Sequence, residues 1–504
     1  MNEVNRAFYP EYSEQKTRLI STYKLSTIVC RPKQILQGAN SLDEADGMTQ
    51  QANSLIQKYN VPGPRYTSYP TVPYWDDETF SAEAWQQTLK RSFNESNASE
   101  GISLYIHLPF CESLCTFCGC HKRVTKRHEV EQPYIQAVLK EWDLYCQLLK
   151  ATPIIKEIHL GGGTPTFFSV EHLTQLIQGI LAKAEVADQH EFSFEGHPNN
   201  TTREHLQALY DLGFRRVSYG VQDYNEKVQR AIHRLQPFEH VQRVTEWARE
   251  IGYDSISHDL VFGLPFQNLD DVLNTIEQTH RLMPDRLAFY SYAHVPWIKG
   301  NGQRGFKDED VPKDELKRQC YEEGKNRLLA HGYHEIGMDH FALANDGMYQ
   351  SFKNGSLHRN FMGYTASKTQ VMIGLGVSSI SDSWYSFAQN EKSIEDYYAR
   401  LERNEIPVFK GHVLNREDLV IRQHILNLMC SFETSWANPE LNFAEIEQVL
   451  QQLQEMQEDE LLSIQDQRIQ ILEKGKPFVR NICMAFDLRL KRRMPNNRIF
   501  SMTI

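Results

Sequence analysis

Apolar residues along the middle of the chain follow patterns that predict alternating strands and helices. Six runs rich in apolar and aromatic residues predict strands: SLYIHLPF, EIHLGGGTPT, HEFSFEGHP, RRVSYGVQD, SISHDLVFGLP and RLAFYSYAHVP. Between them, segments such as EQPYIQAVLKEWDLYCQLLK and REHLQALYDLGF have the helical period. Strands that alternate with helices indicate a parallel sheet of β/α units, so the pattern predicts an α/β fold.

Polar residues and glycines gather where the predicted strands end. These residues are the Gly161–Thr164 segment, Glu195, Gln222, Asp259 and Ala293. In β/α barrels and open α/β sheets, the carboxyl ends of the strands carry the active site. We therefore expect the functional site at this end of the sheet.

The pattern changes in the last quarter of the chain. From about residue 383 it becomes helical, as in REDLVIRQHILNLMCSF and EIEQVLQQLQEMQEDELL. We predict a separate, mainly helical C-terminal domain over 383–504, winged-helix-like, that covers the mouth of a barrel domain over 53–382.

The start of the chain has no convincing periodic element, which is usual for an unpacked terminus. Residues 1–52 are therefore predicted to be an N-terminal extension. Within it, residues 1–47 are expected to be mobile or dispensable for catalysis, with Met48 as a candidate natural start.

Composition places the chain among soluble globular proteins. It has 504 residues, of which 40% are hydrophobic and 24% charged. No apolar run has membrane-spanning length and no signal peptide is evident. The net charge of −11 argues against a general nucleic-acid binder. We expect no membrane span and no nucleic-acid partner.

Nine cysteines occur, and four of them lie in the ten-residue stretch CESLCTFCGC. The other five are scattered and do not resemble a secreted disulfide framework: Cys30, Cys146, Cys320, Cys430 and Cys483. A reducing, cytoplasmic location is therefore expected, where crowded cysteines usually bind metal or do redox work.

The spacing within that stretch narrows the chemistry. Cys111, Cys115 and Cys118 form C-x3-C-x2-C, and Cys120 follows as a surplus fourth thiol. Structural zinc sites usually pair two knuckles, and no second knuckle lies nearby. Three thiolates on one loop suit three irons of a 4Fe–4S cluster and leave the fourth iron open. A zinc loop and plain surface thiols are the simpler alternatives.

The C-x3-C-x2-C loop, followed by the GGGTP strand end, resembles the radical S-adenosylmethionine (radical SAM) superfamily. Eight motifs, in order from about residue 53 to the C-terminus, resemble its oxygen-independent coproporphyrinogen III oxidase family: GPRYTSYPT, YIHLPFCESLCTFCGC, GVQDYN, YAHVP, GMDHFA, HRNFMGYT, GLGVSSIS and RNICMAFD. The resemblance implies a partial parallel β/α barrel of radical SAM type with a mainly helical C-terminal domain.

The resemblance also implies a reaction. Cys111, Cys115 and Cys118 would bind a 4Fe–4S cluster, and the open iron would chelate S-adenosylmethionine. The resulting 5′-deoxyadenosyl radical would take hydrogen from a propionate, and loss of carbon dioxide and an electron would leave a vinyl group. Two rounds would convert coproporphyrinogen III into protoporphyrinogen IX in haem biosynthesis. A flavodoxin or ferredoxin-type electron donor and a monomeric oxidoreductase are expected.

Two bound S-adenosylmethionine molecules are implied, and each has a set of matching residues. Those around the cluster-bound molecule are Tyr105, Gly162, Glu195 and Ile380. Those around the second are Phe117, Gly163, Thr164, Gln222, Arg234, Asp259 and Ala293. All are expected to position the cofactor, and none is assigned as a proton-transfer group.

Each of these residues also has an ordinary structural interpretation. Glycines after a strand usually form a turn, and a carboxylate at a strand end is often a helix cap. Ile380 and Ala293 carry the least chemical information because small apolar residues are usually core. His197, which follows Glu195 and Gly196, departs from the family pattern and leaves the exact substrate open.

Basic residues supply further candidates. HKRVTKRH at 121–128 is either a solvated helix face or an electrostatic aid to the cluster or to an acidic substrate. Arg65, Arg359 and Arg480 lie in family-like motifs and are candidates for propionate binding, in no order that the sequence reveals.

Two other functions stay open at this point. One is a different radical SAM enzyme on the same scaffold, which transfers methyl groups or handles haem. The other is a non-enzymatic iron–sulfur protein, which would hold a cluster without cleaving S-adenosylmethionine.

Overall fold

The structure is a computed structural model that describes residues 55–76, 80–295, 303, 305–495 and 499–503. The expected extension over 1–47 and the candidate start at Met48 lie outside the described residues. Within the described ranges, every helix is too short or too polar to cross a bilayer.

All six predicted strands form, and they pair side by side in parallel in the order of the sequence. They are β1 (Ile102–Leu108), β4 (Ile154–Gly162), β5 (Glu185–Gly196), β6 (Phe214–Gln222), β7 (Ser255–Phe262) and β8 (Arg286–Ser291). Because the strands are parallel, their carboxyl ends meet at one edge of the sheet, where the predicted site residues lie.

Further strands extend this sheet at both sides. They are β9 (His334–Gly337), β10 (His340–Ala342), β13 (Met372–Leu375), β14 (Ile380–Asp382), β15 (Ser386–Asn390) and β16 (Val408–Val413). In the described chain the sheet runs from β16 to β9, and these two terminal strands do not pair with each other. The barrel is therefore open, as the partial-barrel prediction requires.

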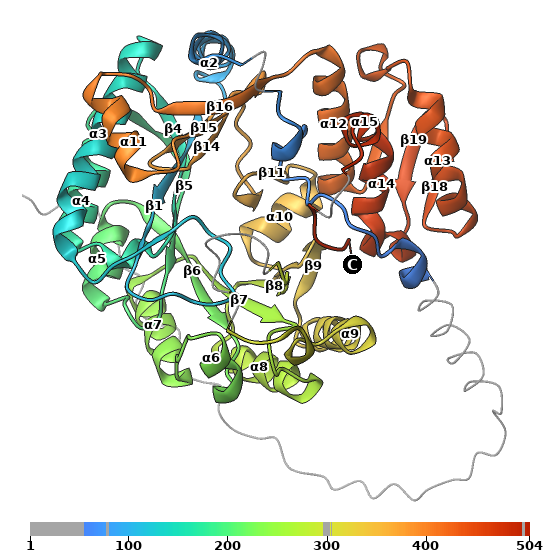
Figure 1. Cartoon of the computed structure of the whole chain (residues 1–504), viewed down its shortest axis with the longest axis horizontal. Helices are drawn as coiled ribbons and strands as arrows, with labels where there is room; N and C mark the ends of the chain where they lie inside the picture. Colours follow the sequence, from blue (N-terminus) through green and yellow to red (C-terminus); the bar gives the residue numbers. More distant parts are fainter. Residues whose placement is uncertain (1–54, 77–79, 296–302, 304, 496–498, 504) are drawn as a thin grey trace, which may run out of the picture. The chain divides into compact units, whose positions relative to one another are not determined.

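Helices cover the outer side of the parallel strands (Figure 1). They are α3 (Glu131–Leu149), α4 (Val170–Leu181), α5 (Arg203–Asp211), α6 (Glu226–Ala231), α7 (Phe238–Ile251) and α8 (Leu269–Leu282). The helical spacing of Val138, Trp142 and Tyr145 puts them in one buried cluster with Leu104 and Ile106 of β1. Burying a large apolar side chain contributes roughly 1.5–3 kcal/mol, so this face fixes α3 on the sheet.

The sheet continues past residue 382, the last residue of the predicted barrel domain, because β15 and β16 belong to it. Helices dominate from α12 (Arg416–Ser431) onward, with α13 (Ile446–Glu458), α14 (Val479–Phe486) and α15 (Leu488–Arg492). Three short strands form a separate antiparallel sheet among them: β17 (Glu433–Ser435), β18 (Leu462–Gln465) and β19 (Arg468–Ile471). We propose that the helical domain begins near α12.

The first described residues pack against this helical part. Tyr59, Tyr66 and Tyr69 share a buried cluster with Ile425 of α12 and Ile482 of α14. The GPRYTSYPT segment is thus held between the C-terminal helices and the barrel strands, which matters for its Arg65.

Candidate active site

The cysteine loop is closed by a short pair of parallel strands, β2 (Phe110–Cys111) and β3 (Arg123–Val124). The backbone N–H of Thr125 donates to the carbonyl of Cys111 at 2.9 Å. HKRVTKRH is therefore mostly extended, with only a short 3-10 turn at its end (His128–Val130), so the helix-face interpretation is wrong. Pairing with β2 holds Arg123 and Val124 in an extended conformation, whatever the helix propensity of the segment.

Hydrogen-bond donors approach two of the three predicted ligands. The Thr164 hydroxyl donates to the Cys111 Sγ atom at 3.4 Å, and the Arg234 Nη1 atom donates to Cys115 Sγ at 3.6 Å. The hydroxyl favours the thiolate of Cys111 that iron requires, although burial raises the pKa of this thiol to about 11. The loop remains partly accessible at Cys118 and exposed at Cys120.

Among the described residues, no three His, Cys, Asp or Glu side chains converge on a point that a single metal ion would occupy. Three cysteines of an iron–sulfur cluster each bind a different iron, so their sulfur atoms need not converge in this way. The chemistry and the loop position of the thiols fit a cluster better than a lone ion.

The glycine turn after β4 lies against the end of β1. The N–H groups of Gly163 and Thr164 donate to the carbonyls of Leu108 and Phe110, at 2.8 and 2.9 Å. A Cβ atom on Gly163 would come within 2.5 Å of the Pro109 backbone, and Gly162 has a φ of +110°. Only glycine fits these positions, and the turn also leaves backbone close to any ligand at this strand end.

Tyr105, His159 and Glu195 converge from β1, β4 and β5. The Tyr105 and His159 rings stack 6.0 Å apart, and His159 Nε2 lies 3.5 Å from Glu195 Oε1. The Gly162 N–H donates to Glu195 Oε2 at 3.3 Å. Burial acts to raise the pKa of Glu195, but His159 and the Gly162 N–H outweigh it and lower that pKa below its ordinary value. Glu195 is therefore an anion at neutral pH.

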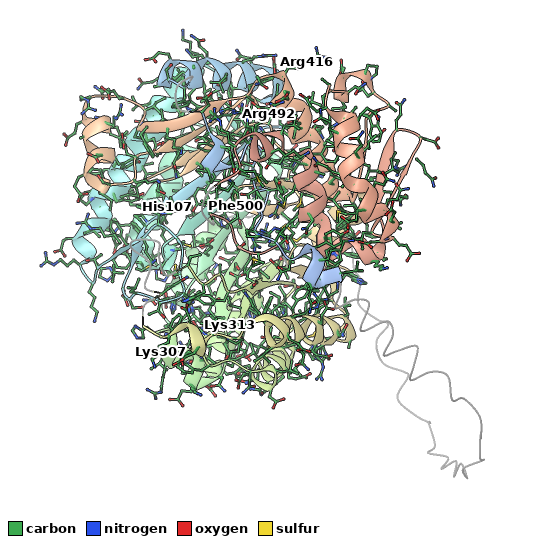
Figure 2. All side chains as sticks on the ribbon, turned by 45° about the vertical axis from the view of Figure 1, so that its right-hand side comes forward. His107, Lys307, Lys313, Arg416, Arg492 and Phe500 are labelled. Carbon is green, nitrogen blue, oxygen red and sulfur yellow. The ribbon has the colours of Figure 1, made fainter. Side chains whose placement is uncertain are left out.

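His107 (labelled in Figure 2) orients the Tyr105 hydroxyl. Burial lowers the pKa of His107 to about 4, so its ring is neutral at pH 7. Its Nε2 atom lies 2.9 Å from the His121 carbonyl, an acceptor, and must carry the proton. Its Nδ1 atom then accepts from the Tyr105 hydroxyl at 3.0 Å. The phenol oxygen keeps its lone pairs for a cationic ligand.

Asp259 lies one strand beyond Ser218, whose hydroxyl donates to both of its carboxylate oxygens at 3.1 Å. Burial, reinforced by the charge of Glu195, raises the pKa of Asp259 to about 7. Asp259, Glu195 and Tyr105 nevertheless keep some exposed surface. These side chains are thus largely desolvated and yet accessible to a ligand at this strand end.

Arg234 lies under the end of β6. Its Nη2 atom donates to the Gly220 carbonyl at 2.6 Å, and a Cβ atom on Gly220 would contact both Gln222 and Arg234. The Nε atom of Arg234 and the Oε1 atom of Gln236 are buried without a hydrogen-bond partner among the described residues. Unpartnered buried polar atoms are costly, so these two atoms suit a polar ligand.

Phe117 and Ala293 are joined through Gln303. Its Nε2 atom donates to the carbonyl of Phe117 at 3.2 Å and to that of Ala293 at 3.1 Å. Gln303 therefore links the cysteine loop to the segment after β8. The ordinary interpretation of Ala293 as core is wrong, because Ala293 is exposed.

Ile380 lies on β14 next to the first group. Gly374 pairs with Tyr105 in register, and a Cβ on Gly374 would come within 2.5 Å of the Ile380 carbonyl. Ile380 is thus near Tyr105 although it is far away in sequence. Part of its side chain packs with Trp75 and Phe387.

His197 acts within its own turn. Its Nδ1 atom accepts from the Asn199 N–H at 3.2 Å, and its own N–H donates to Thr166 Oγ1 at 3.4 Å. Burial, together with the charge of Arg234, lowers the pKa of His197 well below its ordinary value. It is a neutral residue that shapes the turn after β5.

The structure thus places Tyr105, Gly162, Glu195 and Ile380 in one group, and Arg234, Gln222 and Asp259 in another. Gly163 and Thr164 lie instead against the start of the cysteine loop, and Phe117 and Ala293 are joined through Gln303. Sequence reasoning missed five residues that orient these groups: His107, His159, Ser218, Gln236 and Gln303. A signal existed for His107 and His159, because strand alternation puts them on the same face as Tyr105 and Gly161. Gln303 had none.

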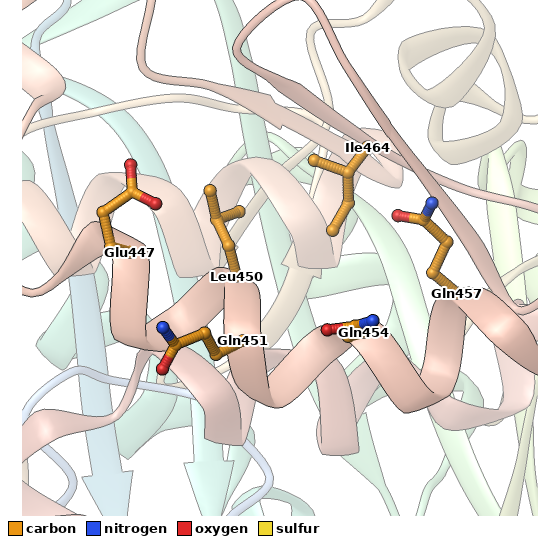
Figure 3. A pocket seen from close by; sticks show the side chains of 6 residues that line it. All are labelled: Glu447, Leu450, Gln451, Gln454, Gln457 and Ile464. Carbon is orange, nitrogen blue, oxygen red and sulfur yellow. The ribbon is translucent and has the colours of Figure 1, made fainter.

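Two surface hollows lie elsewhere, and no predicted site residue lines either of them. One, of about 410 Å3, is lined by Arg230, His233 and Leu235. The other, of about 330 Å3, runs along the outer face of α13 beside Ile464 of β18 (Figure 3).

Comparison with known proteins places this geometry in context. Residues 105–279 match the model of the Radical SAM superfamily. The chain is 37% identical over 446 residues to the oxygen-independent coproporphyrinogen III oxidase of Helicobacter pylori, an alignment that covers 86% of this chain and 96% of that protein. The enzyme of the same name from Escherichia coli (strain K12) is 37% identical over 448 residues, 88% and 96% of the two chains.

A solved structure supports the same relationship. It is described as "Coproporphyrinogen III oxidase (HemN) from Escherichia coli is a Radical SAM enzyme" and aligns with a TM-score of 0.79 at 34% identity. The alignment covers 84% of this chain and 97% of that one. The likeness therefore extends well beyond residues 105–279.

Proposed function

Because the chain belongs to the oxygen-independent coproporphyrinogen III oxidase family of radical SAM enzymes, we propose that the two groups of residues at the strand ends hold its cofactors. The enzyme is an oxidoreductase of porphyrin and haem biosynthesis. It decarboxylates two propionates of coproporphyrinogen III to vinyl groups and gives protoporphyrinogen IX. A 4Fe–4S cluster and S-adenosylmethionine are its cofactors.

Cys111, Cys115 and Cys118 are proposed as the cluster ligands. The hydroxyl of Thr164 and the guanidinium of Arg234 lie 3.4 and 3.6 Å from two of the sulfur atoms, so both can donate hydrogen bonds to sulfur ligands of the cluster. When bound, the cluster and S-adenosylmethionine supply the one-electron chemistry that starts hydrogen removal from a propionate. The protein's own task is to bind, orient and keep water away.

The observation that carries this proposal is the ionised Glu195 beside the Tyr105 phenol oxygen and the Gly162 turn. An anion, a neutral acceptor and close backbone match the ammonium and carboxylate groups of S-adenosylmethionine. Anaerobic titration of the reconstituted protein with S-adenosylmethionine tests it. Glu195→Ala should weaken binding while the cluster absorbance stays unchanged.

A second S-adenosylmethionine is proposed for the group around Arg234, Gln222 and Asp259. Arg234 offers a guanidinium with a buried unpartnered Nε atom, and Asp259 offers a carboxylate. These groups suit a carboxylate and ribose hydroxyls. The binding stoichiometry should be two per chain in the wild type and fall towards one in Asp259→Ala.

A flavodoxin or ferredoxin-type protein is proposed as electron donor. Lys126 and Arg127 are exposed beside the cysteine loop, so an acidic donor can dock close to the cluster. Reduction by such a donor should slow with ionic strength, and more so in the wild type than in Lys126→Gln. We further propose that the enzyme works as a monomer in the reducing cytoplasm.

A further inference from the structure

Two buried arginines bind four consecutive carbonyl groups of the GPRY segment at 63–66. Arg480 donates through Nη2 to Gly63 and through Nε to Pro64 at 2.9 Å. Arg359 donates through Nη2 to the Arg65 carbonyl at 3.2 Å and through Nε to the Tyr66 carbonyl at 3.3 Å. The segment is therefore fixed along its whole length, and the direction of the Arg65 side chain with it.

Arg359 and Arg480 thus form a clamp on the 63–66 backbone. The Arg65 side chain extends away from this clamp and stays accessible. Its Nη2 atom donates to Asp339 at 2.7 Å, its guanidinium lies 5.9 Å from the Tyr290 ring centre, and 38% of the side chain is exposed. Among the described residues, Asp339 is the only hydrogen-bond partner of that guanidinium. Its remaining N–H donors face accessible space.

Positive charge exceeds negative charge around this segment. Arg65, Arg359 and Arg480 interact with one another electrostatically, and within the described ranges Asp339 is the only carboxylate in an ion pair with any of them. The nearby carboxylate of Asp487 accepts a hydrogen bond from the Tyr66 hydroxyl at 3.2 Å. The Nη1 atom of Arg359, a residue only 4% exposed, is buried without a hydrogen-bond partner in the part of the chain that the structure describes.

The positive charge of these arginines also acts on a neighbouring histidine, His340. Burial, with the charge of Arg359, lowers the pKa of His340 to about 4, and its Nε2 atom lies 3.3 Å from the Tyr290 hydroxyl. A buried excess of cations is unfavourable unless an anion compensates for it. This arrangement favours an anionic ligand at Arg65.

The cationic group lies beside the proposed cofactor site. Tyr290 is on β8, the strand that pairs with β7 and its Asp259, and the charges of both Asp259 and Arg65 act on the Tyr290 hydroxyl. A ligand held at Arg65 would thus extend towards the strand ends where the chemistry takes place.

We propose that Arg65 binds a carboxylate of the substrate, a porphyrinogen with four of them, while Arg359 and Arg480 are positioning residues that hold the Arg65 backbone. This inference rests on the proposed function. The planar guanidinium can keep Asp339 on one edge and bind a substrate carboxylate on another. Arg480 is unsuited to that task, because its Nε and both Nη atoms already bind carbonyls, the third of them that of Met502 at 2.8 Å.

The test compares two air-stable fluorescent probes, coproporphyrin III and its uncharged tetramethyl ester. Both are titrated into the reconstituted holoenzyme without reductant, so that no turnover occurs. Arg65→Gln should weaken binding of the free acid on the order of tenfold to a hundredfold, the range for a lost charge-assisted contact. Binding of the ester should change by less than about twofold. The affinity of Arg65→Lys for the free acid should lie between those of the wild type and Arg65→Gln. Lysine keeps the positive charge but lacks the planar guanidinium that binds a carboxylate with two N–H groups.

The matched control is Arg403→Gln, which removes an exposed arginine that hydrogen-bonds with Glu405 at the surface. It should bind both probes as the wild type does. Arg359→Lys should weaken the free acid less than Arg65→Gln does, because it disturbs only the clamp. A wild type that binds acid and ester equally well, or an Arg65→Gln protein with unchanged acid binding, would overturn the proposal.

The proposed function is judged by a separate readout, formation of vinyl product by the reduced wild type. If that product forms and the affinities of the acid do not depend on Arg65, only this inference fails. In turnover, Arg65→Gln should raise KM for the substrate with a smaller change in kcat, because the lost contact is with a non-reacting carboxylate.

Discussion

The backbone N–H of Gly162 donates a hydrogen bond to the Oε2 atom of Glu195 at 3.3 Å. This bond joins the glycine turn after β4 to the end of β5 and fixes the carboxylate beside Tyr105. Because glycine at 162 has a φ of +110°, a side chain there would strain the turn as well as collide with His107. The position of the Glu195 carboxylate therefore depends on the backbone conformation of Gly162.

Removing the Glu195 carboxylate should weaken handling of S-adenosylmethionine without loss of the cluster. Glu195→Ala is expected to lower affinity by about tenfold or more, because a charge-assisted contact with the ligand ammonium is lost. Glu195→Gln keeps an acceptor for Gly162 and should fall in between. Affinity is measured by anaerobic titration and the cluster by iron content.

The matched control is Glu185→Ala, at the exposed opposite end of the same strand. It should bind S-adenosylmethionine as the wild type does. Equal losses in Glu185→Ala and Glu195→Ala would show that the effect is one of stability and not of the site.

Cluster content should depend on three cysteines of the loop and not on the fourth. Serine at Cys111, Cys115 or Cys118 is expected to abolish most of the iron bound after anaerobic reconstitution, because each sulfur binds a different iron. Cys120→Ser should retain it, although Cys120 is close enough to hydrogen-bond with Cys118. Full loss in Cys120→Ser alone, with Cys118→Ser intact, would refute the assignment.

Asp259 should make the cofactor-free protein less stable as pH rises. The folded pKa of about 7 lies above the ordinary 3.8, so between these values the folded chain holds a proton that the unfolded chain has released. Stability therefore falls from about pH 4 to pH 7, and the full cost applies above that range. Asp259→Asn removes the cost and still accepts from Ser218.

Urea unfolding of wild type and Asp259→Asn from pH 5 to pH 8 measures this effect. The variant's advantage should grow with pH to about 1–2 kcal/mol, a value reduced for the partial exposure of the group. Comparison with the variant isolates Asp259 from Asp487, whose pKa burial also raises, to about 6. A difference that does not vary with pH would contradict the prediction.

Arg480 should matter for stability because three carbonyls depend on it: Gly63, Pro64 and Met502. Arg480→Met leaves these acceptors unsatisfied and is expected to lower the free energy of unfolding by at least about 3 kcal/mol. Arg403→Met, which removes only surface contacts, should change it by less than about 0.5 kcal/mol. Comparable losses in both variants would argue against the clamp.

The sequence predicted the fold well where a pattern is repeated. The six parallel strands and the helices α3 and α5 follow from apolar periodicity, and strand ends place Glu195 and Asp259 at one edge. The strands β15 and β16 were missed because they flank α11 (Ile394–Glu402) and lie in the stretch that was predicted to be mainly helical. The 121–128 segment was misjudged because its conformation depends on pairing with β2 rather than on its own residues.

The site was predictable only as far as its residues have recognisable chemistry. Cys111, Arg234 and Asp259 could be named from motifs, whereas Gln303 joins two loops that are distant in sequence and gives no local signal. The three arginines could not be ranked from the sequence, because their roles depend on which carbonyls they meet. Contacts over several hundred residues decide that Arg480 is structural and Arg65 is accessible.

We propose that this protein decarboxylates coproporphyrinogen III at the strand-end site. The direct measurement is an anaerobic assay of the reconstituted protein with a low-potential reductant, S-adenosylmethionine, the substrate and an electron acceptor, in which the product is followed as protoporphyrin after oxidation. We predict vinyl product from the wild type and a loss on the order of a hundredfold in Asp259→Ala, because catalysis depends on positioning. A wild type with an intact cluster that cleaves S-adenosylmethionine yet forms no vinyl product with any acceptor would contradict the claim.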